Sequence, residues 1–471
     1  MPIKTRFTLM IFICLLTIST SNAQEGQSEY ISKFNLFRAE ENYSSLINID
    51  RSKLSFWESL KNIPLNNSGD IYMTLGGEVR PRGEFYTDRY SEKGNDVNFY
   101  SQRLALHSAI QWEQNVRFFA ELYHGYTSHE KEFAEYDVID FHQGFVEYRS
   151  SDEVIGDWYI RSGRQELSLG SARLVGFREG PNIRRSFDMV RVKQNSAVLS
   201  LQTFYGKEVV PEFDSFDNKS HLFNHQAINP QLWGVVSEFV IAGDIGKSEL
   251  YYLGFHVNEA RYNDVVGEEK RHSVGLRRYG ELGDAITYNS EFTYQFGDVG
   301  GSTINAFNLE TDTSYIFHHS PWKPSVGLKL EWSSGDDKQG DGEINTFNPM
   351  FVNPSYYSMN KYTTPANMVS IHPSITAYPM AKMKLYLEFA WFKRESRADG
   401  LYRATRFFSR EPGVDNSKDI GQQLGFKLSY EFNKNWSFDF DFSYFIAGRY
   451  LKQTGDSEDV VYLSPTVRFR F

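Results

Sequence analysis

The chain has 471 residues, a formal net charge of −10 and 16% aromatic residues, yet its mean hydropathy is −0.49. An acidic chain is a poor partner for nucleic acid. Because Cys14 is the only cysteine, disulfides and thiolate metal sites are excluded from everything after the first 23 residues.

The first 23 residues have the pattern of a secretory signal peptide. Lys4 and Arg6 precede an apolar run over residues 7–18, and small residues at 21–23 offer a cleavage site. No later stretch approaches the roughly 18 consecutive apolar residues that a transmembrane helix needs. We therefore expect either a soluble exported protein or an outer-membrane barrel.

Residues 24–72 show spacings typical of short helices. Phe34 and Phe37 are three residues apart, and Phe56 and Trp57 stand four and three residues before Leu60. We expect a short N-terminal periplasmic segment here, too short to be the full plug of a transporter.

Residues 73–471 are dominated by alternation of apolar and polar residues. In RLALHSAIQW (103–112), Leu and Ile alternate with Arg, His and Gln, and a tight turn leads to VRFFAEL (116–122) with the same pattern. In NWSFDFDFSYFIAG (435–448) aromatic residues alternate with Ser and Asp for about ten residues, the length that crosses a bilayer at a tilt. Aromatic faces of this kind disfavour a secreted β-sandwich lectin.

Alternation alone identifies about eighteen strands, and an even number is what a closed single-chain barrel requires. The connections are short after even-numbered strands and mostly long after odd-numbered ones, as in outer-membrane barrels. We therefore predict an all-β fold, a transmembrane antiparallel β-barrel of about 18 strands over residues 73–471, with short periplasmic turns and long extracellular loops. The predicted strands are 73–86, 98–112, 116–126, 141–149, 157–168, 187–194, 197–206, 231–240, 249–258, 271–279, 285–297, 303–316, 325–334, 367–378, 383–392, 420–432, 435–449 and 460–471.

If the aromatic faces contact lipid, the opposite faces line the lumen. Arg80, Arg82, Arg103 and Arg117 then point inward on the first three strands. A ring of arginines selects anions, because a guanidinium binds a carboxylate with two hydrogen bonds and never loses its charge. The alternative for any single arginine is that it pairs with a lumen glutamate.

Residues 163–187, GRQELSLGSARLVGFREGPNIRRSF, concentrate positive charge in an acidic chain. Alternation sends Arg161 inward if Trp158 and Ile160 face lipid, but Leu167 and Leu169 demand the opposite phase. Either a β-bulge at Ser162-Gly163 reconciles the two, or Leu167 and Leu169 already lie above the membrane. The arginines of this segment are Arg164, Arg173, Arg178, Arg184 and Arg185.

Two further features follow along the chain. SSGDDKQGDGE (333–343) lacks the spacing of an EF-hand, so we interpret it as a solvated acidic loop and not as a calcium site. The chain ends in VRFRF, which resembles the signal by which the barrel-insertion machinery recognises outer-membrane proteins.

The pieces G-R-Q-x-L, G-S-x-R-L-V and N-x-x-R-S-F of residues 163–187 resemble the signature segment of the alginate-export family of outer-membrane porins. LGGEVRPRGEF in the first strand and the aromatic C-terminal strand are also similar. The resemblance implies a monomeric barrel in the bacterial outer membrane whose arginine-lined constriction passes an anionic saccharide of the alginate or uronate type. It carries the five arginines of 163–187 over to the constriction or to a loop that folds into it. Glu166 and Glu179, however, weaken the local positive field.

The resemblance implies no cofactor and no metal, and we find no nucleophile elbow, P-loop or H-E-x-x-H motif. Two other functions stay open from sequence: a general or otherwise anion-selective porin, and an outer-membrane barrel hydrolase.

Overall fold

The computed structural model describes residues 30–471, except 32, 129–133, 221–228, 242–245, 405–406 and 414. The predicted signal peptide and residues 24–29 lie outside the described residues. Among the described residues, no helix is both long enough and apolar enough to cross a membrane.

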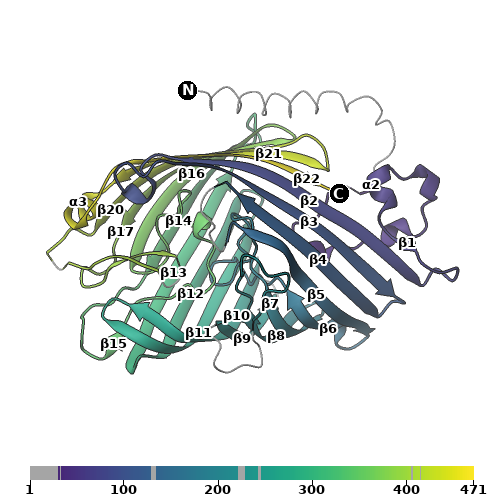
Figure 1. Cartoon of the computed structure of the whole chain (residues 1–471), viewed down its shortest axis with the longest axis horizontal. Helices are drawn as coiled ribbons and strands as arrows, with labels where there is room; N and C mark the ends of the chain where they lie inside the picture. Colours follow the sequence, from purple (N-terminus) through teal and green to yellow (C-terminus); the bar gives the residue numbers. More distant parts are fainter. Residues whose placement is uncertain are drawn as a thin grey trace.

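Eighteen antiparallel strands form one closed barrel (Figure 1). Each strand pairs with its neighbour along the chain, and β22 pairs back with β2. The eighteen predicted strands are thus confirmed, although single boundaries differ by several residues. The barrel strands are β2 (Ile71–Tyr86), β3 (Val97–Trp112), β4 (Val116–Thr127), β5 (Asp137–Asp152), β6 (Gly156–Gln165), β7 (Phe187–Asn195), β8 (Leu199–Glu208), β9 (Gln231–Phe239), β10 (Lys247–Tyr262), β11 (Val265–Leu282), β12 (Ile286–Val299), β13 (Ser302–Ile316), β14 (Ser325–Ser333), β16 (Met368–Met380), β17 (Met383–Lys393), β20 (Asp419–Glu431), β21 (Trp436–Ala447) and β22 (Val460–Arg470).

The other elements are short. β1 (Ile63–Pro64) and β15 (Glu343–Ile344) add two residues each to the same sheet, and β18 (Leu401–Ala404) pairs with β19 (Phe407–Arg410) as a separate hairpin. The helical pieces are α2 (Phe56–Ser59), α3 (Arg449–Thr454) and the 3₁₀ turns η1 (Arg38–Glu40), η2 (Ser44–Leu46), η3 (Arg51–Lys53), η4 (Arg89–Ser91) and η5 (Pro354–Tyr356).

The two ends of the barrel differ, as the alternating connections predicted. At one end, here called the turn end, short turns such as 113–115, 153–155 and 196–198 join the strands. The opposite end, the loop end, carries most of the long connections. Two connections at the loop end are nevertheless tight hairpins, at 263–264 and 300–301. Gly300 and Gly301 have φ of +55° and +88°, which a two-residue hairpin between twisted strands requires.

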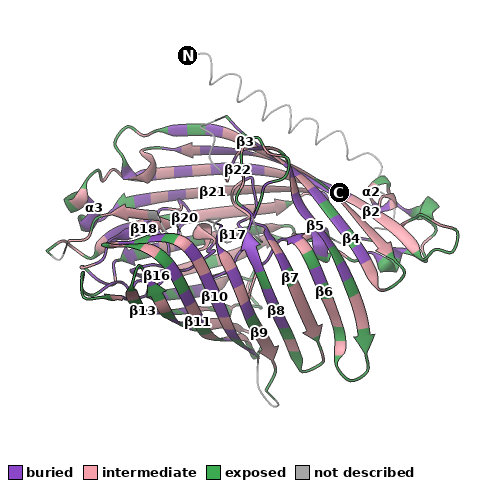
Figure 2. Ribbon diagram, turned by 60° about the horizontal axis from the view of Figure 1, so that its bottom comes forward, coloured by how far each residue is buried: buried purple, intermediate pink, exposed green. Residues whose placement is uncertain are grey.

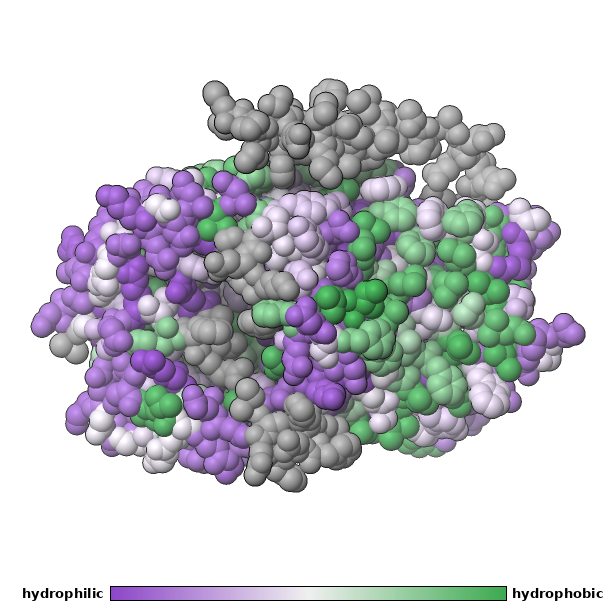
Figure 3. All heavy atoms as spheres, viewed as in Figure 1, coloured by the Kyte–Doolittle hydropathy of each residue, from purple (hydrophilic) through white to green (hydrophobic). Residues whose placement is uncertain are grey.

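Buried and more exposed residues alternate along the strands, as Figure 2 shows for β6 to β11, and the exposed residues are mostly apolar whereas many of the buried ones are polar. Leu106 and Phe118 are exposed on the outside, whereas Arg103 and Glu147 are buried on the inside. Figure 3 shows hydrophobic residues spread over the half of the wall nearer the turn end, with hydrophilic residues gathered at the loop end. The predicted division into a lipid-type face and a lumen face is therefore present.

Two long connections from the loop end fold into the lumen. These are residues 166–186, between β6 and β7, and residues 334–367, between β14 and β16. Val175 forms a parallel bridge with Phe351, and both are buried in one apolar cluster with Phe255 of the wall. The two segments pack against each other because each can bury its apolar residues only inside the barrel.

Part of the N-terminal segment, which the sequence predicts to be a short periplasmic segment, enters the lumen from the turn end. Arg38 donates a hydrogen bond to the carbonyl of Gly77 within β2, and Ala39 packs against Phe119 and Phe145 of the wall. Because these wall residues lie well inside the strands, residues 36–41 occupy lumen space. Sequence spacing indicated the local turns but carried no sign of this long-range docking.

Candidate functional site

Residues 166–186, here called the lumen loop, cross the barrel from one wall to the other. Glu179 lies against β2 and β3, whereas Arg173 reaches β12 and β13. Since the segment follows β6 directly, the end of that strand determines where the loop enters the lumen.

At the wall formed by β2 and β3, the lumen loop contacts a concentration of positive charge. Arg80 of β2 and Arg103 of β3 stand directly opposite each other, an arrangement that is destabilising for like charges. The Glu179 carboxylate lies 3.2 Å from Arg103 and 3.7 Å from Arg80. Both guanidinium groups also donate to the backbone carbonyl of Pro181, at 2.8 and 2.7 Å. The loop thus neutralises and binds the pair.

At the opposite wall the charges are reversed. Glu291 of β12 stands directly opposite Glu310 of β13, which in turn faces Glu331 of β14. Arg173 lies 2.7 Å from Glu310 and 3.7 Å from Glu291, and the Ser171 hydroxyl donates to Glu291 at 2.7 Å. The lumen loop therefore carries negative charge to the basic wall and positive charge to the acidic wall.

The return of the loop is held by its last arginines. Arg184 lies 3.1 Å from Glu166 and 3.2 Å from Glu179, so it ties the two halves of the loop together. Arg185 pairs with Glu208 at 2.8 Å and donates to the carbonyls of Gly176 and Phe351.

Arg178 has a φ of +60° and donates to the carbonyl of Ile183. Its role in the geometry is to close the tight path of the loop before its return strand.

Burial and charge shift the pKa values of the loop carboxyls in opposite directions. Burial alone would raise the pKa of Glu179, but Arg103 and Arg184 outweigh it and lower that pKa to about 2. Burial raises the pKa of Glu166 to about 7 because only Arg184 and Arg103 oppose it. Glu179 therefore stays ionised at neutral pH.

The remaining candidate arginines are also buried. Arg82 contacts Glu84, Glu135 and the carbonyl of Gly180, and Arg117 lies 3.3 Å from Glu147.

Arg164 differs from the others. The strand register runs through Ser162-Gly163 without a shift, so no bulge is present, and Leu167 lies in the lumen cluster beyond the strand. By that register Arg164 shares the outward face of Ile160 and Ser162, where it pairs with Asp188 at 2.9 Å.

The family model for alginate export matches residues 71–460. The chain belongs to the alginate-export family. This alginate-export barrel lies in the bacterial outer membrane, as family and fold imply, and the fold is that of a channel. The turn end is therefore periplasmic and the loop end extracellular. No curated protein sequence matches the chain.

Solved outer-membrane barrels of Pseudomonas aeruginosa share the fold. The crystal structure of OpdO has a TM-score of 0.57 and 12% identity, and the match covers 86% of this chain and 99% of that one. OccK2 (OpdF) in complex with glucuronate gives 0.55 and 12%, over 85% and 98% of the chains. OccK8 (OprE) gives 0.53 and 11%, over 85% and 98%.

In this alginate-export barrel, a cavity of about 380 Å³ lies on the periplasmic side of the lumen loop. Ser168, Leu169 and Gly170 of the loop line it, together with charged residues of both signs from the wall: Arg191, Lys193, Arg277, Glu238 and Glu249. Within the described part of the chain, neither Arg191 nor Lys193 forms an ion pair with a carboxylate; Arg191 donates only to the Gln202 amide oxygen, at 2.6 Å.

The candidate residues named from sequence did not include these two cations. The alternation V-R-V-K in β7 sends Arg191 and Lys193 inward with Val190 and Val192 outward, so the signal was present. What alternation could not show is which lumen cations lack a carboxylate partner, because the partners come from distant strands and loops.

Proposed function

We propose that this barrel is a channel for anionic saccharides of the uronate type, which pass through the lumen beside the lumen loop. The observation that carries the proposal is the pair Arg191 and Lys193, two cations that line a lumen cavity and, among the described residues, form no ion pair, although Glu238 and Glu249 line the same cavity. The arginines at the crossing of the loop, in contrast, are already paired with protein carboxylates.

The chemistry of the cavity fits this solute class. The Arg191 guanidinium is always charged and can bind a carboxylate with two parallel hydrogen bonds, while Lys193 supplies a mobile point charge. In a confined lumen such charges attract anions more strongly than on an open surface. OccK2, a barrel of the same fold, was crystallised with glucuronate, a sugar with one carboxylate.

A general porin is the second candidate, and one observation favours it. One row of directly opposed, mostly acidic residues runs across β9 to β14. It consists of Glu238, Glu249, Arg277, Glu291, Glu310 and Glu331. A predominantly acidic wall opposite a basic wall orients polar solutes of either charge.

The two candidates are distinguished by conductance in planar bilayers. For the unmodified channel we expect anions to be preferred over cations and uronate oligomers to block the current at lower concentration than neutral oligomers. In the double variant Arg191→Ala/Lys193→Ala the anion preference should fall several-fold and uronate block should weaken about tenfold or more, because two unpaired charges are removed.

The matched control is Lys382→Ala, which removes an exposed lysine from the periplasmic turn between β16 and β17. It should leave selectivity and block unchanged. If the double variant behaves like this control, the cavity does not select the solute and the general porin is the better description.

A further inference from the structure

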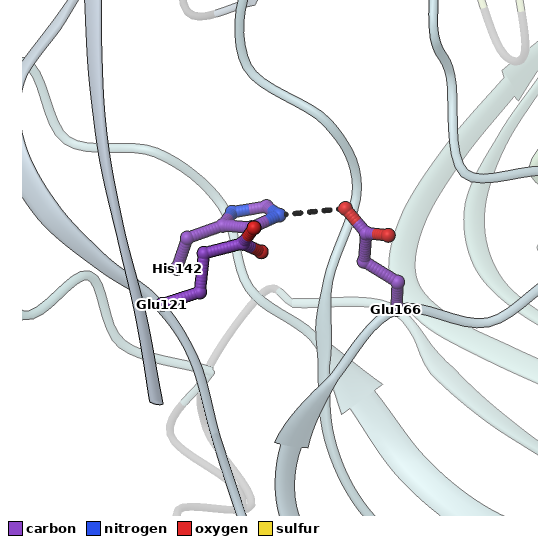
Figure 4. A group of neighbouring side chains, drawn as sticks. All are labelled: Glu121, His142 and Glu166. Atoms are coloured by element: carbon purple, nitrogen blue, oxygen red, sulfur yellow. Dashed lines mark hydrogen bonds and ion pairs between the residues drawn. The ribbon is translucent and has the colours of Figure 1, made fainter. Parts of the chain in front are cut away.

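Three polar side chains converge where the lumen loop leaves the wall. Glu121 of β4, His142 of β5 and Glu166, the first residue of the loop, are 1%, 1% and 5% exposed. His142 Nε2 lies 3.0 Å from Glu166 Oε1, and one donor atom from each of the three lies within 4.8 Å of the others. Figure 4 shows the Glu121 carboxylate beside the imidazole and the imidazole directed at Glu166.

A β-bulge brings the histidine into this position. Glu121 stands opposite Gln143, but Leu122 stands opposite Phe141, so His142 is the extra residue of β5. Bulges redirect a side chain at the cost of one ladder position. The Tyr123 ring stacks on the imidazole at 3.9 Å between ring centroids and fixes its plane.

Gln143, next to the bulge, contacts the Glu121 carboxylate and the backbone of Glu166. Its amide nitrogen donates to Glu121 Oε2 at 2.6 Å, and its amide oxygen accepts from the backbone N–H of Glu166 at 3.1 Å. At metal sites, hydrogen bonds from neighbouring residues of this kind typically hold the metal-binding side chains in place.

The group lacks positive charge. Glu121 Oε1 and Glu166 Oε2 are buried without a hydrogen-bond partner, and within the described residues Glu121 forms no ion pair. Arg184 balances only Glu166, at 3.1 Å. A buried carboxylate oxygen without a partner is costly, and a cation bound between the two carboxylates would satisfy both free oxygens.

We propose that Glu121, His142 and Glu166 bind one Zn²⁺ ion, through His142 Nε2 and one oxygen of each carboxylate. A neutral imidazole suits zinc and disfavours Ca²⁺ or Mg²⁺, which take oxygen ligands. Zinc–ligand distances of about 2 Å in a tetrahedral site place the donor atoms roughly 3.3 Å from one another, so donor atoms that now lie within 4.8 Å close by up to about 1.5 Å. Three protein ligands leave a fourth position for solvent.

Bound zinc fastens the lumen loop to the barrel wall. Glu166 begins the loop and Arg184, near its end, contacts the same carboxylate, so one ion fixes both ends of the loop against β4 and β5. This role is independent of which solute the channel carries.

The test is a zinc titration by calorimetry of the chelator-stripped, detergent-solubilised chain. We expect one Zn²⁺ per chain, and Co²⁺ in its place should give the visible absorption bands of a tetrahedral N/O site. Glu121→Gln keeps the size and shape of the side chain but removes its charge, so the affinity for zinc should fall more than tenfold. His142→Gln should abolish the Co²⁺ bands.

His256→Gln is the matched control, because His256 Nε2 also lies 2.8 Å from a glutamate, Glu268, but without a second carboxylate. It should bind zinc as the unmodified chain does. Absence of one-to-one zinc binding in the unmodified chain overturns the proposal whatever the variants do. The proposal is also overturned if the Glu121→Gln chain without zinc is more heat-stable than the unmodified chain and binds zinc with unchanged affinity. In that case the two carboxylates share a proton and do not bind a metal ion.

Discussion

Glu179 carries one negative charge into a group of four guanidinium groups. Arg80, Arg103, Arg184 and Arg468 lie between 3.1 and 3.7 Å from its carboxylate. Removing a buried partner costs about 3–5 kcal/mol because it leaves the opposite charges uncompensated. The Glu179 carboxylate thus affects both the stability of the lumen loop and the electrostatic field in the lumen.

Glu179→Gln should therefore raise the preference of the channel for anions and lower its resistance to unfolding. We expect a severalfold increase in the anion-to-cation permeability ratio and a lower urea midpoint for loss of heat-modifiable mobility. Glu113→Gln, in an exposed periplasmic turn, should change neither. An unchanged permeability ratio would contradict the central position of Glu179.

The pH dependence follows from the same carboxylate. Its pKa is lowered to about 2 in the folded chain, so its stabilisation is fully present above about pH 4.5, the ordinary glutamate value. That contribution decreases progressively as the pH falls from about 4.5 to about 2 and is absent below pH 2. Single-channel conductance should therefore show no step attributable to loop release between pH 7 and pH 4, and a step within that range would contradict the assignment.

Alternation along the strands predicted the inward direction of Arg80, Arg82, Arg103 and Arg117 but not their partners. Glu179 is about a hundred residues distant from Arg80, and no local pattern indicates that the two meet. Alternation is less reliable at the end of a strand, as Arg164 shows. The register places Arg164 on the outward face, whereas Arg161, three residues earlier, faces the lumen.

At the level of elements, the N-terminal segment occupies part of the lumen and contacts both the wall and the lumen loop. Glu40 lies 2.9 Å from Arg161, Glu41 lies 3.6 Å from His107, and Phe37 packs edge-on against Phe177 of the lumen loop. Arg161 stands directly opposite Arg191, and Glu40 pairs with Arg161 only. The segment and the loop meet inside the barrel.

Glu40→Gln/Glu41→Gln should loosen this segment and increase single-channel conductance, because the Glu40–Arg161 ion pair and the Glu41–His107 contact with the wall are lost. The pair near Glu40 is partly exposed, so the energetic effect is smaller than for a fully buried pair. Glu153→Gln, exposed in the turn between β5 and β6, is the control. Equal conductance in the double variant and the control would show that the segment does not restrict flow.

Strands were predictable and lumen segments were not, for a physical reason. Each strand separates lipid-type residues from polar ones, and this imprints a period of two on the local sequence. The path of 166–186 and 334–367 depends on packing between Val175 and Phe351, residues far apart in the chain. The hairpins at 263–264 and 300–301 were predicted as longer connections because the strands continue beyond the apolar band.

On the scale of the whole molecule, the apolar band sets how charge is tolerated outside. The outward face of β11 carries Glu268 and Lys270 near the loop end, then Val274 and Leu276, and after Arg278 it ends with Leu282 at the turn end. Leu276 therefore lies within the apolar band and Leu282 at its periplasmic edge.

Leu276→Arg should destabilise the barrel by about 2–4 kcal/mol, whereas Leu282→Arg should cost about 0–1 kcal/mol, because the cost of a charge on the lipid face depends on depth. Reversible urea unfolding in lipid vesicles measures the difference. Equal destabilisation by the two variants would mean that the band is placed differently along β11.

The seam between β2 and β22 has a consequence for the order of folding. Glu78 and Arg470 pair across it although 392 residues separate them, and Trp57 packs on Phe469 and Phe471 beside it. Closure must therefore follow the formation of every other strand pair, since a contact of such sequence separation carries the largest chain-entropy cost. Until then the growing sheet has two open edges, each able to template pairing with another chain. The N-terminal segment covers one end of the seam. Its docking and the pairing of the two open edges therefore occur in the same late step of folding, the closure of the barrel.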